Sequence, residues 1–323
     1  MTEKISRREV VASLAKGSVV AAAATSAGFS AESRAASATE KYTVSFDIHQ
    51  HLESQNDNYT PFETAALIAK DFDLRTRIMD DNGIEKSIIL LGTNYRRTNG
   101  IEDTKRVNDL VAAYVSKHSD RFPVGAGTVE VTHGDASLKE LDRCANELKL
   151  RGIVWHHAHS GVHINHPFMR PILKRMQDLR LIPFIHIASP PFESTWMIEE
   201  LAEEFPAITF VALGGLAARN TMEESIRMAR KRKNILFDTS VVIHAKEISI
   251  ETHIQRMGSD RMVFGSDIHA WPSIGQIPKL TSNMINESGG EINPHASITD
   301  DQKADILGRN AMRLLGLSDD GPR

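Results

Sequence analysis

Two histidines near the start of the chain have the spacing of metal ligands. His49 and His51 lie in the stretch FDIHQHL, two positions apart and shortly after Asp47. In a β-strand alternate side chains point to the same face, so Asp47, His49 and His51 would share one face while Phe46 and Ile48 share the other. Two imidazoles on one face can bind one cation. The spacing therefore predicts half of a metal site, whose remaining ligands come from elsewhere in the chain.

Two later apolar runs also end in polar residues. His186 closes IPFIH and Asp267 closes MVFGSD. A buried imidazole or carboxylate is costly without a partner, so each needs a local explanation. Taken alone, His186 is typical of a hydrogen-bonded core histidine and Asp267 of a helix cap. Taken with His49 and His51, they form a mixed nitrogen and oxygen set that suits one Zn²⁺, Mn²⁺ or Fe²⁺ ion with room for water.

Eight short apolar runs alternate with amphipathic segments from residue 43 onward. The runs are TVSFDIH, KSIILLGT, FPVGAGTV, RGIVWH, IPFIHI, AITFVAL, NILFDTS and DRMVFGSD. Between them, apolar residues recur at three- and four-residue spacing, which predicts helices that include 104–118, 136–149, 167–180, 193–205 and 221–233. This alternation predicts a (β/α)₈ TIM barrel as a single domain over 39–323, with a doubly wound open sheet as the alternative.

In such a barrel the polar strand ends meet at the C-terminal mouth, where barrel active sites lie. The segment 268–298 is rich in Gly, Pro and Asn and is predicted to form a loop over this mouth. The segment 299–316 is predicted to form a closing helix.

The first 38 residues have the order of an export signal. Arg7 and Arg8 precede the weakly apolar run GSVVAAAATSAGF, and the small-residue stretch AASA ends at Ala38. The arginine pair resembles a twin-arginine signal, although two valines follow where that signal prefers Phe-Leu. We therefore expect a signal peptide over 1–38 and an exported protein, periplasmic or secreted. The apolar run is too short to span a bilayer, which needs about 20 apolar residues.

The overall composition is that of an ordinary globular protein. The 323 residues are 41% hydrophobic and 25% charged, with a formal net charge of -4. There is no basic excess, so no nucleic-acid partner is expected. Cys144 is the single cysteine, which excludes an internal disulfide.

Taken together, the motifs resemble those of the amidohydrolase superfamily. DIHQHL, GIVWHHAHSGVHINHPFMRPIL, LIPFIHIA, FPAITFVALGG and DRMVFGSD are similar to successive motifs of its amidohydrolase-related branch, which includes aminocarboxymuconate-semialdehyde decarboxylase and related hydrolases. The resemblance covers nearly all of 43–316. It implies a (β/α)₈ barrel that holds one divalent metal, zinc first and manganese as the alternative. Motif matching places the metal ligands at His49, His51, His186 and Asp267.

The chain departs from this branch at two strand ends. Ala212 in FVALGG stands where the branch usually has a histidine that orients water or substrate, and Val154 stands where it often has lysine. His156 matches a frequent histidine and is a candidate for both catalysis and substrate binding. His269 is a catalytic candidate that could replace the imidazole missing at Ala212. Most other histidines of the fourth-strand loop are expected to be solvated, namely His157, His159, His163 and His166.

Metal-dependent hydrolysis is the leading interpretation. A divalent metal lowers the pKa of bound water toward about 7 and polarises a carbonyl oxygen. Asp267 would pass the water's proton to the leaving group, so the expected small-molecule substrate is an amide, ester or lactone. Two alternatives remain open. The first is a non-hydrolytic lyase that decarboxylates or hydrates an unsaturated or aromatic carboxylate. The second is a metal-binding protein without turnover, suggested by Ala212.

Two residues near the predicted mouth are candidates for substrate binding. Arg219, just after the sixth strand, would bind the carboxylate in the lyase alternative, and Trp271 is the second candidate. The oligomeric state is left open, with a homodimer as one option.

Overall fold

The computed structural model describes residues 44–52, 65–187, 190–216, 219–240, 250–268 and 298–317. Within these ranges, eight strands form one sheet in the order β1 to β8. Each strand pairs in parallel with the next strand of the chain. The strands are β1 His51–Leu52, β2 Ile88–Leu91, β3 Val124–Gly127, β4 Gly152–Trp155, β5 Ile182–His186, β6 Phe210–Leu213, β7 Ile235–Asp238 and β8 Met262–Val263. All eight predicted strands are present, and their order is that of a barrel rather than a doubly wound sheet.

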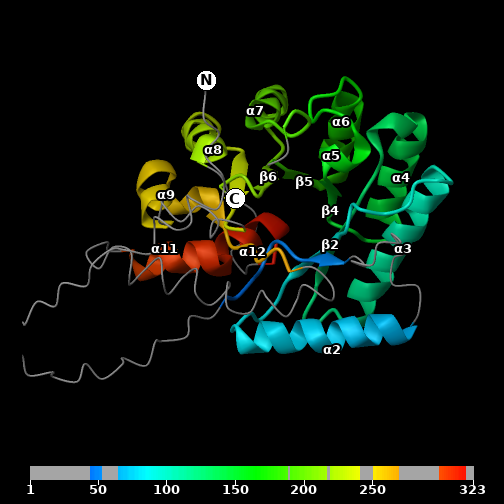
Figure 1. Ribbon diagram of the computed structural model, residues 1–323, viewed down its shortest axis with the longest axis horizontal. Helices are drawn as coiled ribbons and strands as arrows, with labels where there is room; N and C mark the ends of the chain where they lie inside the picture. The colour runs from blue at the N-terminus through cyan, green and yellow to red at the C-terminus, as the bar shows by residue number, and fades with distance from the viewer. Residues whose placement is uncertain are drawn as a thin grey trace, which may run out of the picture. The chain divides into compact units, whose positions relative to one another are not determined.

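Helices lie between successive strands and outside them (Figure 1). They are α2 Ala65–Asp81, α3 Ile101–Lys117, α4 Asp135–Asn146, α5 His157–Ser160, α6 Met169–Leu179, α7 Thr195–Glu204, α8 Arg219–Lys231 and α9 Ile250–Met257, with 3₁₀ turns at Val131–His133 and Ser259–Arg261. The five predicted helices are confirmed, with ends shifted by a few residues. In α6 the buried residues are Met169, Ile172, Leu173 and Met176, which is the spacing of one helix face packed on the sheet.

The sheet closes because the segment after β8 bonds to the segment that leads into β1. The amide of Ile48 donates to the carbonyl of Phe264 at 2.9 Å, and the amide of His51 donates to the carbonyl of Ile268 at 2.8 Å. The amide of Asp267 donates to the carbonyl of His49 at 2.8 Å. The described residues therefore form a closed (β/α)₈ barrel, and the last of these bonds lie beside the predicted metal ligands.

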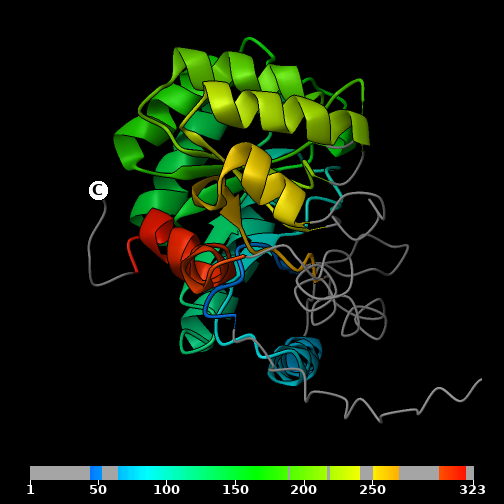
Figure 2. The ribbon, with the colours of Figure 1, turned by 90° about the vertical axis from the view of Figure 1, so that its left-hand side faces the viewer.

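The C-terminal helices pack across the start of this seam (Figure 2). They are α11 Asp300–Ala304, a π-helical turn at Asp305–Arg309 and α12 Asn310–Leu315. The carbonyl of Leu307 accepts from the amide of Phe46 at 3.3 Å, and that of Ile306 accepts from the amide of Phe264 at 2.8 Å. Thr299 and Gln302 form a capping box at the start of α11. The predicted closing helix is thus present and ties the segment before β1 to the residue that follows β8.

Several predictions fall on residues outside the described part of the chain. These are the signal peptide at 1–38, almost all of the mouth segment 268–298, His269 and Trp271. Arg219 begins α8, but its side chain is outside the described part. Within that part, no helix is both long enough and apolar enough to cross a membrane.

Candidate metal centre

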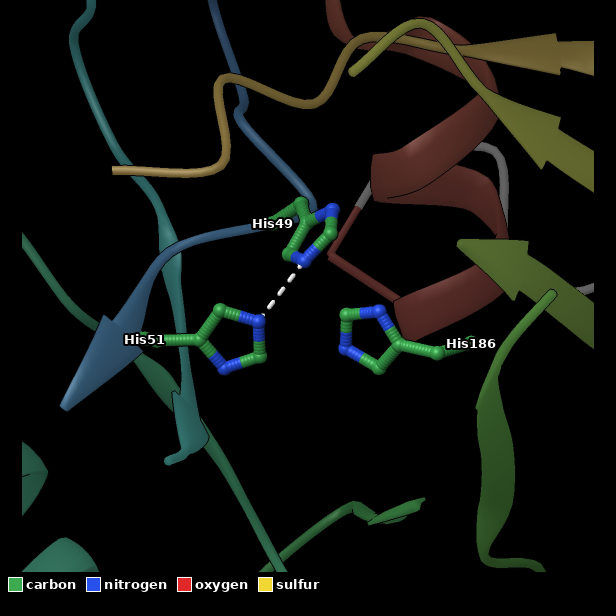
Figure 3. Close-up of side chains that lie close together, drawn as sticks. All are labelled: His49, His51 and His186. Carbon is green, nitrogen blue, oxygen red and sulfur yellow. Dashed lines mark hydrogen bonds between the residues drawn. The ribbon is translucent and has the colours of Figure 1, made fainter. Parts of the chain in front are cut away.

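Three of the predicted ligands converge at one end of the barrel (Figure 3). His49 precedes β1, His51 begins it and His186 ends β5. The Nε2 atoms of His49 and His51 lie 2.9 Å apart. One ligand nitrogen from each of the three histidines lies within 4.8 Å of the others. The imidazoles predicted from separate strands therefore face one common point.

Asp267, the fourth predicted ligand, follows β8 and reaches the same point. Its Oδ1 lies 3.2 Å from Nε2 of His49 and 3.6 Å from Nε2 of His51. Its side chain is 26% exposed, whereas those of His49 and His51 are 1% and 4% exposed. Its φ of 56° is in the left-handed region, which non-glycine residues seldom adopt. An unusual backbone conformation thus aims the carboxylate at the histidines from the open side.

The chemical state of His186 fits a metal ligand. Its Nε2 is buried and has no hydrogen-bond partner among the described residues. Burial, with His51 and His49 close by, holds its pKa well below the usual range. A neutral imidazole with an unused buried lone pair is the form in which histidine binds metals. The donor set of three imidazoles and one carboxylate therefore fits one divalent metal ion.

A buried carboxylate orients the first ligand. Oδ2 of Asp238, the last residue of β7, lies 2.6 Å from Nδ1 of His49, and its Oδ1 accepts from the amide of Gly214 at 2.7 Å. Burial would lower the pKa of His49, but the charges of Asp267 and Asp238 outweigh it and raise the pKa overall. The same negative potential would attract a cation. The sequence analysis did not single out Asp238, although ILFD ends in a polar residue as IPFIH does.

Asp47 holds the ligand-bearing segments together from within. It is fully buried, and its Oδ1 accepts from the amides of His49 at 2.9 Å and Ser266 at 3.1 Å. Its Oδ2 accepts from Nε2 of Gln50 at 2.9 Å. Burial raises the pKa of Asp47 to about 6, against the effect of these hydrogen bonds. Its shared face with the histidines was predicted, but its role as a link between β1 and the end of β8 was not.

Two further histidines, His156 and His159, stack in a row with His186. The ring of His156, directly after β4, stacks on that of His186 with 4.7 Å between centroids, and the ring of His159 stacks on His156 at 4.0 Å. Nδ1 of His156 lies 2.6 Å from Oε1 of Glu193, which is fully buried, while the His156 side chain is 24% exposed. The structure thus places His156 beside the predicted metal ligands. Glu193, its partner, was not predicted.

The expectation of solvated loop histidines holds only in part. His159 and His163 are exposed and His166 is half-buried. His157, by contrast, is 0% exposed, because α5 turns it toward the interior. Burial lowers the pKa of His157 to about 4. His157 is therefore a neutral core residue.

The register of β6 shows which of its last residues points toward the predicted ligands. Residues opposite each other on neighbouring parallel strands point to the same face, and Leu213 is opposite His186. Ala212 is opposite Ile185 and Phe237, the neighbours of His186 and Asp238, so it points to the other face. The inner position at the end of β6 is therefore held by Leu213. The absence of the usual histidine at Ala212 stays a prediction from the motifs, and the register adds that the Ala212 side chain points away from the predicted ligands.

Comparison with known proteins agrees with this fold. A family model described as amidohydrolase matches residues 46–317. A 2-amino-3-carboxymuconate-6-semialdehyde decarboxylase of Dictyostelium discoideum is 25% identical over 266 residues, covering 71% of this chain and 70% of the relative. A gamma-resorcylate decarboxylase of Rhizobium sp. (strain MTP-10005) is 27% identical over 129 residues, covering 36% of this chain and 39% of the relative.

Solved structures share the same architecture. A dihydroxybenzoic acid decarboxylase from Polaromonas sp. JS666, with bound manganese and the inhibitor 2-nitroresorcinol, superposes with a TM-score of 0.61 at 18% identity. The match covers 85% of this chain and 98% of that one. The prediction of a hydrolase is wrong on this evidence, because these relatives are named as decarboxylases, which are lyases. One fold can host both chemistries, so motifs that identify the fold could not separate them.

Proposed function

This chain belongs to the amidohydrolase family, and we propose that it is a metal-dependent lyase that removes the carboxyl group of a small aromatic or unsaturated acid. The observation that carries the proposal is the convergence of His49, His51, His186 and Asp267 in a chain whose curated relatives are named decarboxylases. A divalent ion bound by these four residues would supply positive charge to hold substrate oxygens and to stabilise negative charge that develops on them.

The reaction requires one proton transfer that the chain itself must manage. When the bond between the carboxyl group and its carbon breaks, CO₂ leaves and the electron pair stays on that carbon, which must then take up a proton. Asp267 is 26% exposed at the open side of the histidine cluster. We assign it a second role, carrying this proton between solvent and the substrate carbon.

His156 is suited to bind the substrate beside the metal. Its Nδ1 lies 2.6 Å from Oε1 of the buried Glu193, and the ring is stacked on His186. Its remaining nitrogen, Nε2, is then the group that can hydrogen-bond a carboxylate or hydroxyl oxygen of the substrate. His159, stacked on the other side, would extend this binding surface. Arg219, Trp271 and His269 stay candidates for the substrate-facing side, as predicted from the sequence.

The metal is proposed to be manganese or zinc. Three imidazoles and a carboxylate suit zinc and are also compatible with manganese. Elemental analysis of protein purified without chelator distinguishes them. About one equivalent of a single metal per chain, absent from His49→Ala, is the expected result.

The function is tested by CO₂ release from a panel of carboxylic acids. The metal-loaded protein is incubated with 2,6-dihydroxybenzoate, 5-carboxyvanillate and 2-amino-3-carboxymuconate-6-semialdehyde, which represent the acids named for its relatives. Release from at least one acid by the wild type, and none by Asp267→Asn at equal metal content, supports the proposal. A metal-loaded wild type that releases no CO₂ from these or related aromatic acids contradicts it.

A further inference from the structure

A fully buried arginine lies directly behind the ligands of the first strand. Arg75, in α2, is 0% exposed. Its Nη2 donates to the carbonyl of His51 at 2.9 Å, and its Nη1 donates to Oε1 of Gln50 at 3.2 Å. Nη1 also donates to the carbonyl of Ile268, the residue after Asp267, at 3.4 Å. One guanidinium therefore bonds to both backbone segments that carry proposed metal ligands.

Two further buried residues hold this guanidinium. Asp71, one turn earlier in α2, accepts from Nε and Nη2 of Arg75 at 3.1 and 3.0 Å. Tyr114, from α3, donates to Oδ2 of Asp71 at 2.6 Å. Asp71 and Tyr114 are each 1% exposed. The arginine is thus charge-balanced by Asp71, whose hydrogen bonds among the described residues go to Arg75 and Tyr114.

Stability alone does not account for this cluster. Burying an ion pair costs desolvation, and an apolar pair of similar volume often serves stability as well or better. An apolar side chain cannot, however, donate hydrogen bonds to two carbonyls on neighbouring segments. The planar guanidinium of arginine offers five N–H donors in fixed directions, which suits this task.

We propose that Arg75 is a positioning residue of the metal centre. It holds the start of β1 and the segment after β8 at the separation that lets His51 and Asp267 bind the same ion. Its bond to Gln50 extends the effect, because Gln50 donates to Asp47, which accepts in turn from the amides of His49 and Ser266. The inference rests on the metal centre of the proposed function but not on the reaction performed there.

Three variants test this role. Asp71→Asn combined with Arg75→Met removes both buried charges, so no charge is left unpaired. Arg75→Lys keeps the charge, but a single ammonium cannot reach Asp71 and both carbonyls together. Tyr114→Phe is the matched control, because it removes one hydrogen bond to Asp71 but keeps both bonds between Asp71 and Arg75 and every bond to the ligand-bearing segments.

The readouts are the affinity for Mn²⁺ by titration, the visible spectrum of the Co²⁺-substituted protein and the thermal melting temperature without metal. The double variant and Arg75→Lys are expected to lose about 10-fold to 100-fold in Mn²⁺ affinity, as for other changes behind metal ligands, and to show an altered Co²⁺ spectrum. Tyr114→Phe should keep the wild-type affinity and spectrum, whatever its melting temperature.

A folded double variant with wild-type Mn²⁺ affinity and Co²⁺ spectrum overturns the proposal. If the double variant does not fold, wild-type values for Arg75→Lys overturn it in the same way. Equal losses in Tyr114→Phe also overturn it, because the effect would then come from a loosened helix. A wild type that binds Mn²⁺ but releases no CO₂ would contradict the proposed function alone, and the variants would still decide the role of Arg75.

Discussion

Nδ1 of His49 lies 2.6 Å from Oδ2 of Asp238. A carboxylate at the end of β7 therefore fixes the ring of a proposed ligand that lies just before β1. The carboxylate can only accept a hydrogen bond from this nitrogen, so in the neutral ring the proton lies on Nδ1, and Nε2, directed toward His51 and Asp267, is the nitrogen that can bind a metal. A carboxylate behind a metal-binding histidine sets both its tautomer and its orientation.

Asp238→Asn should therefore weaken metal binding while the barrel stays folded. The amide can donate to Nδ1, which favours the tautomer with a proton on Nε2, and that nitrogen cannot then bind a metal. We expect Mn²⁺ affinity to fall by about 10-fold to 100-fold, measured by titration of the metal-free protein. Asp120 is exposed, so Asp120→Asn serves as the control. Equal affinities for the two variants would contradict the role given to Asp238.

The register of β6 predicts different results for two neighbouring histidine substitutions. Ala212 is fully buried on the outer face of the sheet, so Ala212→His forces a polar ring into a packed layer. It should lower the free energy of unfolding by about 1–3 kcal/mol or more and leave the Mn²⁺ affinity of the folded protein unchanged. Leu213→His places an imidazole on the inner face beside His186 and should change the Mn²⁺ affinity. Denaturant unfolding and Mn²⁺ titration of both variants check this, and the reverse pattern would mean that the register is wrong.

Gly265 is needed for close packing behind the site. A Cβ at this position would lie 2.5 Å from Oδ2 of Asp238 and 2.8 Å from Cβ of His49. Gly265→Ala must therefore displace the pair that orients the first ligand, and we expect it to lose Mn²⁺ affinity by at least about 10-fold. Gly125→Ala is the control, because its Cβ would meet side-chain atoms of Leu150 and Val111 at 3.0 Å, away from the site. A Gly265→Ala protein with wild-type affinity would show that the pair can shift freely.

The sequence was sufficient to predict the barrel and the proposed ligands, because both depend on local patterns. Alternation along a strand and a polar residue at its end predicted His49, His51, His186 and Asp267 without any knowledge of contacts. The same rule applied to ILFD would have found Asp238. Arg75 could not be found in this way, since its bonds join it to residues 25 and 193 positions away. The position of Leu213 could not be found either, because it depends on how far β6 is staggered against β5.

Burial of His157 predicts a loss of stability in acid. Its pKa is lowered to about 4, so the folded protein keeps it neutral while the unfolded chain protonates it near the usual 6.5. Below pH 6.5 the unfolded state binds the extra proton, and stability falls until the pH reaches about 4. The contribution is on the order of 3 kcal/mol. Urea unfolding from pH 7 to pH 4 should show a smaller fall in the free energy of unfolding for His157→Leu than for the wild type. His163→Gln, which removes an exposed imidazole from the same loop, should follow the wild type, and parallel curves for all three would contradict the prediction.

Asp267 has a backbone role that is separable from its carboxylate. Its φ of 56° is tolerated better by Asp and Asn than by Ala, for which the left-handed conformation costs roughly 1 kcal/mol. In metal-free protein, Asp267→Ala should thus be less stable than Asp267→Asn by about 1 kcal/mol, and Asp267→Gly should recover part of that difference. All three should lose CO₂ release, because none can carry the proton. Urea unfolding with a chelator measures the first effect and the decarboxylation assay the second. Equal stability of the Ala and Asn variants would mean that the left-handed turn relaxes when the carboxylate is absent, so that the charge rather than the backbone holds Asp267 in place.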